Sequence, residues 1–322
     1  MATLDPQIQA LEENLPGGLA LPMGDPVEAR VNFRDVNVNM ASYQPAADLA
    51  AIEDLEVPGA AGPLAAKLYR PRADGPTATL VYFHGGGFVI GDVEAYDLQV
   101  RTLAENSGAT VLSCDYRLAP EDPFPAGIDD AESITRWALD NVASLGGDPQ
   151  RVAVGGDSAG GNLAAVTAQT LRDQTPGLSA QVLLYPVLDL DDEAEHYPSR
   201  EENAAGPLLT RERIDWFNEL YVPVGADRMN PRMSPGVAED LTGLPPTILV
   251  TAGFDLLRDE GDHYGGRLAA AGVPVRHLRY ESLIHGFCGF GPLSTGCAEA
   301  IAEIGDAVRE QLAADPRATL SA

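Results

Sequence analysis

Short apolar runs, rich in Val, Ile, Leu and Tyr, recur along the chain at spacings that leave room for helices. The runs are TLVYFHGGG (79–87), ATVLSCDYR (109–117), RVAVGGDS (151–158), AQVLLYPVLDL (180–190), PTILVTAGFD (246–255) and VPVRHLRYE (273–281). Runs that do not alternate with polar residues are typical of strands buried on both faces of a parallel sheet. Helical patterns that end in glycine separate several of them, as in residues 95–108 and 127–147. The pattern therefore predicts strands alternating with helices.

An earlier segment adds two strands. AIEDLEVPGAAGPLAAKLYRP (51–71) has strand-like segments at about 51–57 and 64–70 on either side of a glycine-rich turn, which predicts a hairpin. Eight strands, with helices between them from the third onward, predict an α/β fold. We expect an open, mostly parallel sheet flanked by helices on both faces.

Two segments interrupt this alternation. Residues 1–50 carry helix signals punctuated by prolines, and Asp5 before Pro6 is a candidate N-cap. Residues 191–243 lie between two sheet strands and include the helical pattern TRERIDWFNELYV. An insertion there lies beyond the carboxyl ends of the strands, where such sheets bind ligands. We therefore expect an N-terminal cap segment (1–50), a cap insertion (191–243), and one sheet domain formed by residues 51–190 and 244–322.

Composition narrows the classes of partner. The 322 residues are 45% hydrophobic and 21% charged, which is ordinary for a globular protein. The net charge of −27 argues against nucleic acid and anionic membranes, because phosphate binding requires clustered Lys and Arg. Two explanations of the acidity stay open, adaptation to high salt and the codon preference of the host genome. The second is the favoured one.

The sequence contains no signal for a membrane, a secretory pathway or a metal. No segment approaches the ~18 continuous apolar residues of a membrane span, and MATLDPQIQALEEN lacks the basic and apolar regions of a signal peptide. We expect a cytoplasmic protein with no membrane span. Three cysteines are too few for a disulfide framework or a zinc site. Cys114 is expected to be a small buried residue, and a bridge between Cys288 and Cys297 is allowed by spacing but is not favoured.

The heptapeptide GGDSAGG (155–161) lies between the strand-like RVAV and the helical NLAAVTAQTLRD. It contains G-x-S-x-G in the strand–turn–helix context of a nucleophile elbow, with Ser158 at its centre. Gly156 and Gly160 leave room for a sharp turn with a strained serine, and Gly161 for close packing of the helix. A phosphate-binding loop would need G-K-[ST], and the sole lysine lies in a distant strand. Ser158 is therefore the candidate nucleophile, and the adjacent Asp157 is not expected to be the acid of a triad.

A second glycine cluster supplies candidate hydrogen-bond donors for an oxyanion. HGGGF (84–88) follows the strand TLVYF and resembles the loops that donate backbone N–H groups to an oxyanion. Such donors stabilise the negative charge that develops when a carbonyl is attacked, by ~3–4 kcal/mol each. We expect Gly86, Gly87 and Ala159 to form this oxyanion hole, with Gly85 shaping the loop.

A serine nucleophile needs a base and an orienting acid, which are expected in the order Ser, Asp, His. Among the five histidines, only His285 follows the final strand. The others lie in the glycine loop, the insertion, a helix or a strand: His84, His196, His263 and His277. Asp255 ends the strand PTILVTAGF, whereas Asp259 and Asp262 lie further into the following helix and are expected to be solvated or ion-paired. Ser158, Asp255 and His285 are the predicted triad.

Taken together, these motifs resemble the hormone-sensitive-lipase-like (bacterial family IV) esterases of the α/β-hydrolase superfamily. The likeness rests on HGGGF, DYRLAPEDPFPA (115–126), GDSAGGNLAA (156–165), TAGFDLLRDEG (251–261) and IHGF (284–287), and spans nearly the whole chain. It implies an α/β-hydrolase fold with a helical cap. It also implies a carboxylic ester hydrolase without cofactor that acts on small-molecule esters with short to medium acyl chains. Leu256 stands where the family usually has proline, which loosens the turn at Asp255 without removing the acid. Asp122 stands where the family often has histidine, and this position has no identified catalytic role.

Two other functions stay open at this point. The same triad serves hydrolases of amides, lactones or carbamates. Relatives of the family that bind hormones without hydrolysis are small-ligand receptors, but they lack the histidine that this chain keeps. The last strand, VPVRHLRY, is a candidate edge strand, and a homodimer formed through it is expected from the resemblance.

Overall fold

The computed structural model describes residues 2–15, 18–19, 23–41, 47–174, 177–191 and 197–313, and within them the strands form one sheet. The eight strands are β1 (Leu49–Pro58), β2 (Pro63–Pro71), β3 (Thr77–Phe83), β4 (Thr110–Cys114), β5 (Gly147–Asp157), β6 (Ala180–Leu184), β7 (Thr247–Phe254) and β8 (Val275–Ile284). Their order is β1-β2-β4-β3-β5-β6-β7-β8. Only β2 runs antiparallel to its neighbours, since every other pair in this sheet is parallel. The predicted hairpin and the mostly parallel sheet are confirmed.

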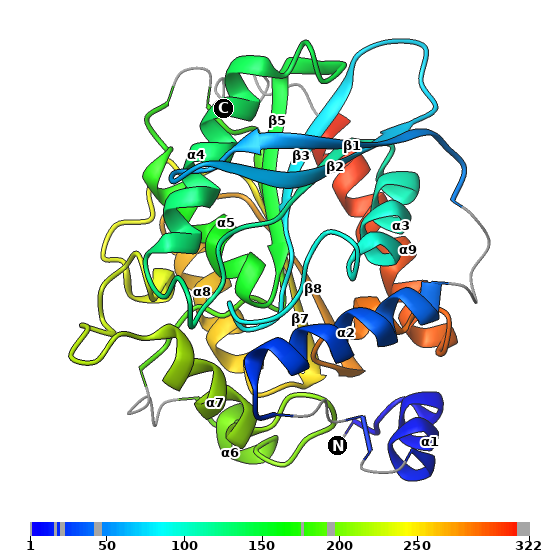
Figure 1. Cartoon of the computed structure of the whole chain (residues 1–322), viewed down its shortest axis with the longest axis vertical. Coiled ribbons are helices and arrows are strands. Elements are labelled where there is room, and N and C mark those ends of the chain that lie inside the picture. Colours follow the sequence, from blue (N-terminus) through cyan, green and yellow to red (C-terminus); the bar gives the residue numbers. More distant parts are fainter. Residues whose placement is uncertain are drawn as a thin grey trace.

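Helices cover both faces of the sheet (Figure 1). The longer ones are α3 (Asp97–Ser107), α4 (Ala126–Asn141), α5 (Ala159–Thr170), α8 (Arg258–Ala270) and α9 (Thr295–Ala313). The helices pack on the sheet through two apolar cores. One core contains residues of α4, α5 and α8, and the other contains residues of α3 and α9. Alternate residues of β3 enter opposite cores, with Val81 and Phe83 in the first and Leu80 and Tyr82 in the second. This two-sided burial explains why the strands are continuous apolar runs.

The boundaries differ from the prediction where the chain turns earlier than the apolar run ends. The run 180–190 was expected to be one strand, but β6 ends at Leu184, because Tyr185 has a φ of 36° that no extended strand allows. The backbone then turns toward β5, and the Val187 N–H donates to the carbonyl of Ser158 at 3.1 Å. Similarly, β3 ends at Phe83, before the glycine loop, and α4 ends at Asn141 rather than near residue 147.

The remaining helices gather at one end of the molecule (Figure 1). They are α1 (Pro6–Asn14), α2 (Pro26–Ala41), α6 (Ser199–Glu202) and α7 (Arg211–Tyr221), and the short 3-10 turns η1 (Pro235–Val237) and η2 (Phe287–Phe290) complete the elements. Asp5 is the N-cap of α1, as predicted, and accepts from the N–H groups of Gln7 and Ile8 at 3.0 Å. These helices come from residues 1–50 and 191–243, the two segments expected to form a cap.

Polar contacts attach α2 and α6 to the sheet domain. The Arg30 guanidinium of α2 donates to the carbonyls of Val89 and Ala119, both at 2.7 Å. In α6, Ser199 Oγ donates to the carbonyl of Leu256 at 2.7 Å. Both helices are therefore attached to loops that follow sheet strands.

The three cysteines, Cys114, Cys288 and Cys297, are buried and free. The expectation for Cys114 is confirmed, and the bridge that spacing allowed is not formed. No helix in the described ranges is long and apolar enough to cross a membrane.

Candidate active site

Ser158 occupies a strained turn between β5 and α5. Its φ of 53° and ψ of −117° lie outside the regions that serine normally adopts, a conformation that costs on the order of 1–3 kcal/mol. The Ser158 N–H donates to the carbonyl of Leu184 at 2.9 Å, and its carbonyl accepts from Asn162. Any side chain at Gly156 or Gly160 would collide with the carbonyl oxygen of Phe83. Small residues at these positions allow β5, the turn and α5 to approach β3 closely.

Ser158, His285 and Asp255 form a chain of hydrogen bonds. Ser158 Oγ lies 3.0 Å from His285 Nε2, and His285 Nδ1 lies 2.8 Å from Asp255 Oδ2. A carboxylate only accepts, so Nδ1 carries the proton and Nε2 accepts from the serine hydroxyl. The other oxygen of Asp255 accepts from the Leu257 N–H at 2.9 Å. Asp255 and His285 are buried, with 1% and 6% of their surfaces exposed, so water competes little for these bonds.

Each of the three residues is the first one after a strand. Ser158 follows β5, Asp255 follows β7 and His285 follows β8. Parallel strands end at the same edge of a sheet, which is how residues so distant in the sequence come together. The structure thus brings together the three side chains that sequence order predicted.

The competing candidates lie elsewhere. Asp259 and Asp262 form ion pairs with Arg258 and Arg279, as expected. His277 lies within β8, with Nε2 2.9 Å from Thr251 Oγ1, and His263 is exposed on α8. His196 lies outside the described residues.

His84 is buried in the glycine loop. Its ring stacks on Tyr116 with a centroid distance of 4.5 Å, and Nδ1 lies 2.7 Å from the carbonyl of Gly85. Burial lowers the pKa of His84 to about 4, so the ring is neutral at neutral pH. The neutral ring of His84 therefore serves as a packing group beside the loop.

The glycine loop presents unpaired backbone donors. Gly86 and Gly87 have φ values of 108° and 59°, which favour glycine. The described residues offer no hydrogen-bond acceptor to the N–H groups of either glycine. Ala159 is the first residue of α5, so its N–H has no partner within the helix. These three N–H groups, the ones predicted to form an oxyanion hole, can therefore bind a ligand oxygen.

Asp157 anchors this loop, a role that the sequence analysis missed. Its Oδ1 accepts from the Gly85 N–H at 3.0 Å and from the Tyr82 hydroxyl at 2.8 Å. Burial is the main reason that the pKa of Asp157 is raised to about 6. A buried acceptor directly before the nucleophile thus ties the loop after β3 to the turn after β5.

Helix α7 packs against the same loop. The rings of Phe88 and Tyr221 stack with centroids 3.8 Å apart and planes 9° from parallel. Phe88 has a φ of 64°, a strained value for an aromatic residue. A side chain at Gly87 would collide with the ring of Phe217. The end of α7 is therefore packed directly on the backbone that carries the Gly86 and Gly87 N–H groups.

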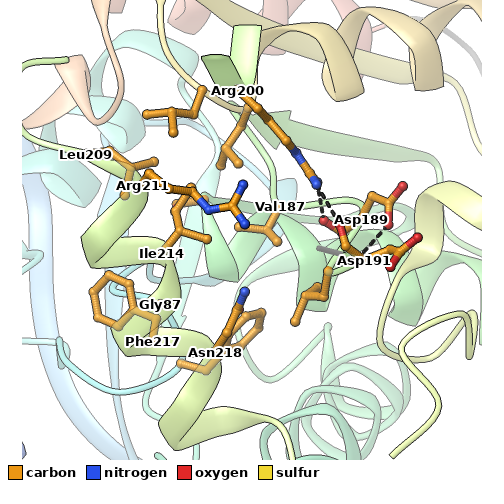
Figure 2. Close-up of a pocket in the computed structure, with 15 residues that line it drawn as sticks. Gly87, Val187, Asp189, Asp191, Arg200, Leu209, Arg211, Ile214, Phe217 and Asn218 are labelled. Carbon is orange, nitrogen blue, oxygen red and sulfur yellow. Dashed lines mark hydrogen bonds between the residues drawn. The ribbon is translucent and has the colours of Figure 1, made fainter. Parts of the chain in front are cut away.

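Ser158 and Gly87 open into a pocket beneath α7 (Figure 2). Its apolar wall comes from the glycine loop, the segment after β6, residues 209–217 and the segment after Asp255. These residues are Phe88, Val187, Leu190, Leu209, Ile214, Phe217, Leu256 and Leu257. The polar lining residues are Asp189, Asp191, Arg200, Arg211 and Asn218. Which face of α7 turns inward could not be predicted from the sequence. Among the described residues, no group of three or more His, Cys, Asp and Glu side chains is arranged to hold a metal ion.

Comparison with known proteins identifies the family of the fold and the class of enzyme. A family described as alpha/beta hydrolase fold matches residues 80–289. The chain is 41% identical to the carboxylic ester hydrolase LipN of Mycobacterium tuberculosis, over 96% of this chain and 84% of that protein. It is 34% identical to an ethyl acetate hydrolase of Pseudomonas putida, over 95% and 97% of the two chains. Among solved structures, a hyperthermophilic esterase from Pyrobaculum calidifontis superposes with a TM-score of 0.88 at 39% identity, covering 97% of this chain and all of that one.

Proposed function

We propose that this chain, which belongs to the hormone-sensitive-lipase-like family of α/β-hydrolase esterases and is a carboxylic ester hydrolase, acts through an acyl-enzyme on Ser158. The observation that carries the proposal is the hydrogen-bonded series Ser158–His285–Asp255, whose serine lines the pocket. The buried carboxylate holds Nδ1 protonated and leaves Nε2 free to accept a proton.

In the first half-reaction, Ser158 Oγ attacks the ester carbonyl carbon and His285 Nε2 takes the hydroxyl proton. The carbonyl oxygen becomes an oxyanion that accepts hydrogen bonds from the N–H groups of Gly86, Gly87 and Ala159. The tetrahedral intermediate then expels the alcohol, which receives the proton from His285. Asp255 stabilises the imidazolium between these two transfers.

In the second half-reaction, water attacks the acyl-enzyme and His285 again takes a proton. The carboxylic acid leaves, and Ser158 Oγ regains its proton from His285. Apart from the ester and water, every group that takes part in the two half-reactions is a side chain or backbone N–H of the chain. The proposed mechanism requires no cofactor.

We propose that residues 1–50 and 191–243 act as a cap that limits the length of the acyl chain. The side chains of Ile214 and Phe217 project from α7 into the pocket (Figure 2). A long acyl chain would have to displace them, whereas a short or medium chain fits the apolar wall. The likeness to an ethyl acetate hydrolase supports the same preference.

The test combines a nucleophile variant with a chain-length series. Ser158→Ala is expected to lower kcat/KM for p-nitrophenyl butyrate by about 10⁴-fold or more with the fold retained. Ser133→Ala, a half-buried serine of α4 that does not line the pocket, is the matched control and is expected to keep wild-type activity. Esters from acetate to octanoate are expected to be hydrolysed faster than laurate. Full activity in Ser158→Ala would refute the nucleophile, and a preference for laurate would refute the cap limit.

We also propose that the protein forms a homodimer through β8. In the described chain, β8 pairs with β7 alone, so its outer edge is open. Such an edge is available for pairing with a second strand.

A further inference from the structure

Two arginines line the pocket, and only one of them is fully engaged by the protein. The Arg200 guanidinium donates to the carbonyls of Asp189 and Asp191, both at 2.6 Å, and to Glu260 Oε2 at 2.8 Å. The Glu260 carboxylate is buried, and Arg200 is 12% exposed. Arg200 therefore fixes the segment after β6 and has little capacity left for a ligand.

The Arg211 guanidinium is held by fewer hydrogen bonds than that of Arg200. Its Nε donates to Asp215 Oδ1 at 3.0 Å, one turn further along α7. Its two terminal nitrogens have no hydrogen-bond or ion-pair partner in the described parts of the chain. The guanidinium points from α7 into the pocket (Figure 2). Because Arg211 and Asp215 are 38% and 48% exposed, their pairing is weak and leaves the end of the guanidinium available.

Asn218 offers a second donor on the same helix. Its side chain is half-buried, lines the same pocket, and has no hydrogen-bond partner among the described residues. Arg211, Ile214 and Asn218 repeat at helical spacing and thus share one face of α7. Ile214 and Phe217 supply apolar surface beside the two polar groups.

The two acidic residues that line the pocket lie on the side opposite Arg211. Figure 2 shows Asp189 and Asp191 at the end of Arg200, apart from Arg211. An anion in this pocket would be repelled from that side and attracted to α7. A guanidinium with two free nitrogens matches a carboxylate, which it can bind with two parallel hydrogen bonds.

From these observations we propose that Arg211 and Asn218 form a subsite for a carboxylate carried by the substrate. The substrate class is then the half-esters of dicarboxylic acids, whose ester group lies at Ser158 and whose free carboxylate lies at α7. The apolar residues between the two ends hold the methylene chain. This inference rests on the proposed function, because it assigns the substrate of the same site.

The experiment compares charged and neutral substrates of equal shape. Monoethyl succinate, glutarate and adipate are each paired with the ethyl ester in which an isopropyl group replaces the carboxylate. Release of ethanol gives kcat/KM for both members of a pair, and their ratio is the readout. Because the ratio cancels any general change in catalysis, it reports the subsite alone.

Arg211→Met removes the charge and the donors but keeps the length of the side chain. It is expected to lower the charged-to-neutral ratio by about tenfold for the chain length that spans the pocket, through a higher KM for the half-ester. Asp215→Asn leaves Arg211 without its competing carboxylate and is expected to raise the ratio. The matched control is Arg276→Met, which removes an exposed arginine of β8 that pairs with Glu310 outside the pocket and is expected to keep the wild-type ratio.

A wild-type ratio in Arg211→Met at all three chain lengths would overturn the subsite, and so would an equal loss in Arg276→Met. If the wild-type enzyme hydrolysed neither the charged nor the neutral esters, the proposed function itself would fail, and the subsite with it. Hydrolysis of the neutral esters therefore separates the two failures.

Discussion

The carboxyl edge of the sheet and the inner face of α7 both line the pocket, but they are built in different ways. At the sheet edge, Ser158, Asp255 and His285 are each the first residue after a strand, so the backbone positions them. On α7, an ordinary helix supplies Arg211, Ile214, Phe217 and Asn218, and only the side chains distinguish this wall from any other amphipathic surface. We therefore propose that the reaction depends on residues at the strand ends and that the choice of substrate depends on the side chains of α7.

After Ser158→Ala, the largest expected effect comes from the acid at the sheet edge. In Asp255→Asn the amide can present an N–H to His285, which favours the wrong tautomer and removes the charge that stabilises the imidazolium. We expect kcat for p-nitrophenyl butyrate to fall by about 10³- to 10⁴-fold, with a smaller change in KM. Steady-state kinetics on a variant with a wild-type circular dichroism spectrum would measure this loss.

Asp259→Asn is the matched control, because Asp259 lies four residues later and is paired with Arg258 rather than with a histidine. It is expected to stay within a few-fold of wild type. Comparable losses in both variants would mean that the charge of this region, and not the contact with His285, supports catalysis.

An intermediate effect is expected where the two regions meet. In Tyr221→Leu the stack on Phe88 is lost, so the glycine loop is free to move away from the position that α7 imposes. Because Tyr221 does not line the pocket, we expect a fall in kcat of about tenfold with little change in KM, as for a partly misplaced oxyanion donor. Activity and thermal melting would be measured on the same preparation.

Tyr221→Phe separates the ring from the hydroxyl. The Tyr221 hydroxyl is buried and has no hydrogen-bond partner among the described residues, so its removal is expected to leave kcat near wild type and stability equal or higher. If Phe lowered kcat as much as Leu, the stack would not be what positions the loop.

The same contrast explains what the sequence could predict. Ser158, Asp255 and His285 could be predicted as candidate catalytic residues, because each follows an apolar run within a short local motif. Tyr185 was not recognised as the end of β6, since nothing in LLYPVL indicates a residue with positive φ. Arg211 was also missed, because helical periodicity shows that α7 has two faces but not which element each face contacts. Such contacts are tertiary and need the packed structure.

The role of Asp157 could not be predicted either, because its contacts with Gly85 and Tyr82 are tertiary. A prediction with a smaller expected effect tests this role. Its native pKa of about 6 lies above the value of about 3.8 for an unfolded chain, so between these values the native state binds more protons. The free energy of unfolding contributed by this group therefore falls as pH rises from about 4 to about 6, and is flat above. Between pH 5 and pH 7 the wild type is expected to lose about 1 kcal/mol relative to Asp157→Asn.

Urea unfolding of both proteins at the two pH values measures this difference, and the contributions of other buried acids cancel. Asp148→Asn is the control, because the Gln150 N–H and Arg151 lower the pKa of that carboxylate, which is then ionised throughout this range. A wild-type protein that gained stability relative to Asp157→Asn on going to pH 7 would show an Asp157 stabilised as the anion by Gly85 and Tyr82. The sheet edge would then hold the glycine loop by charge, in addition to the backbone geometry that places Ser158.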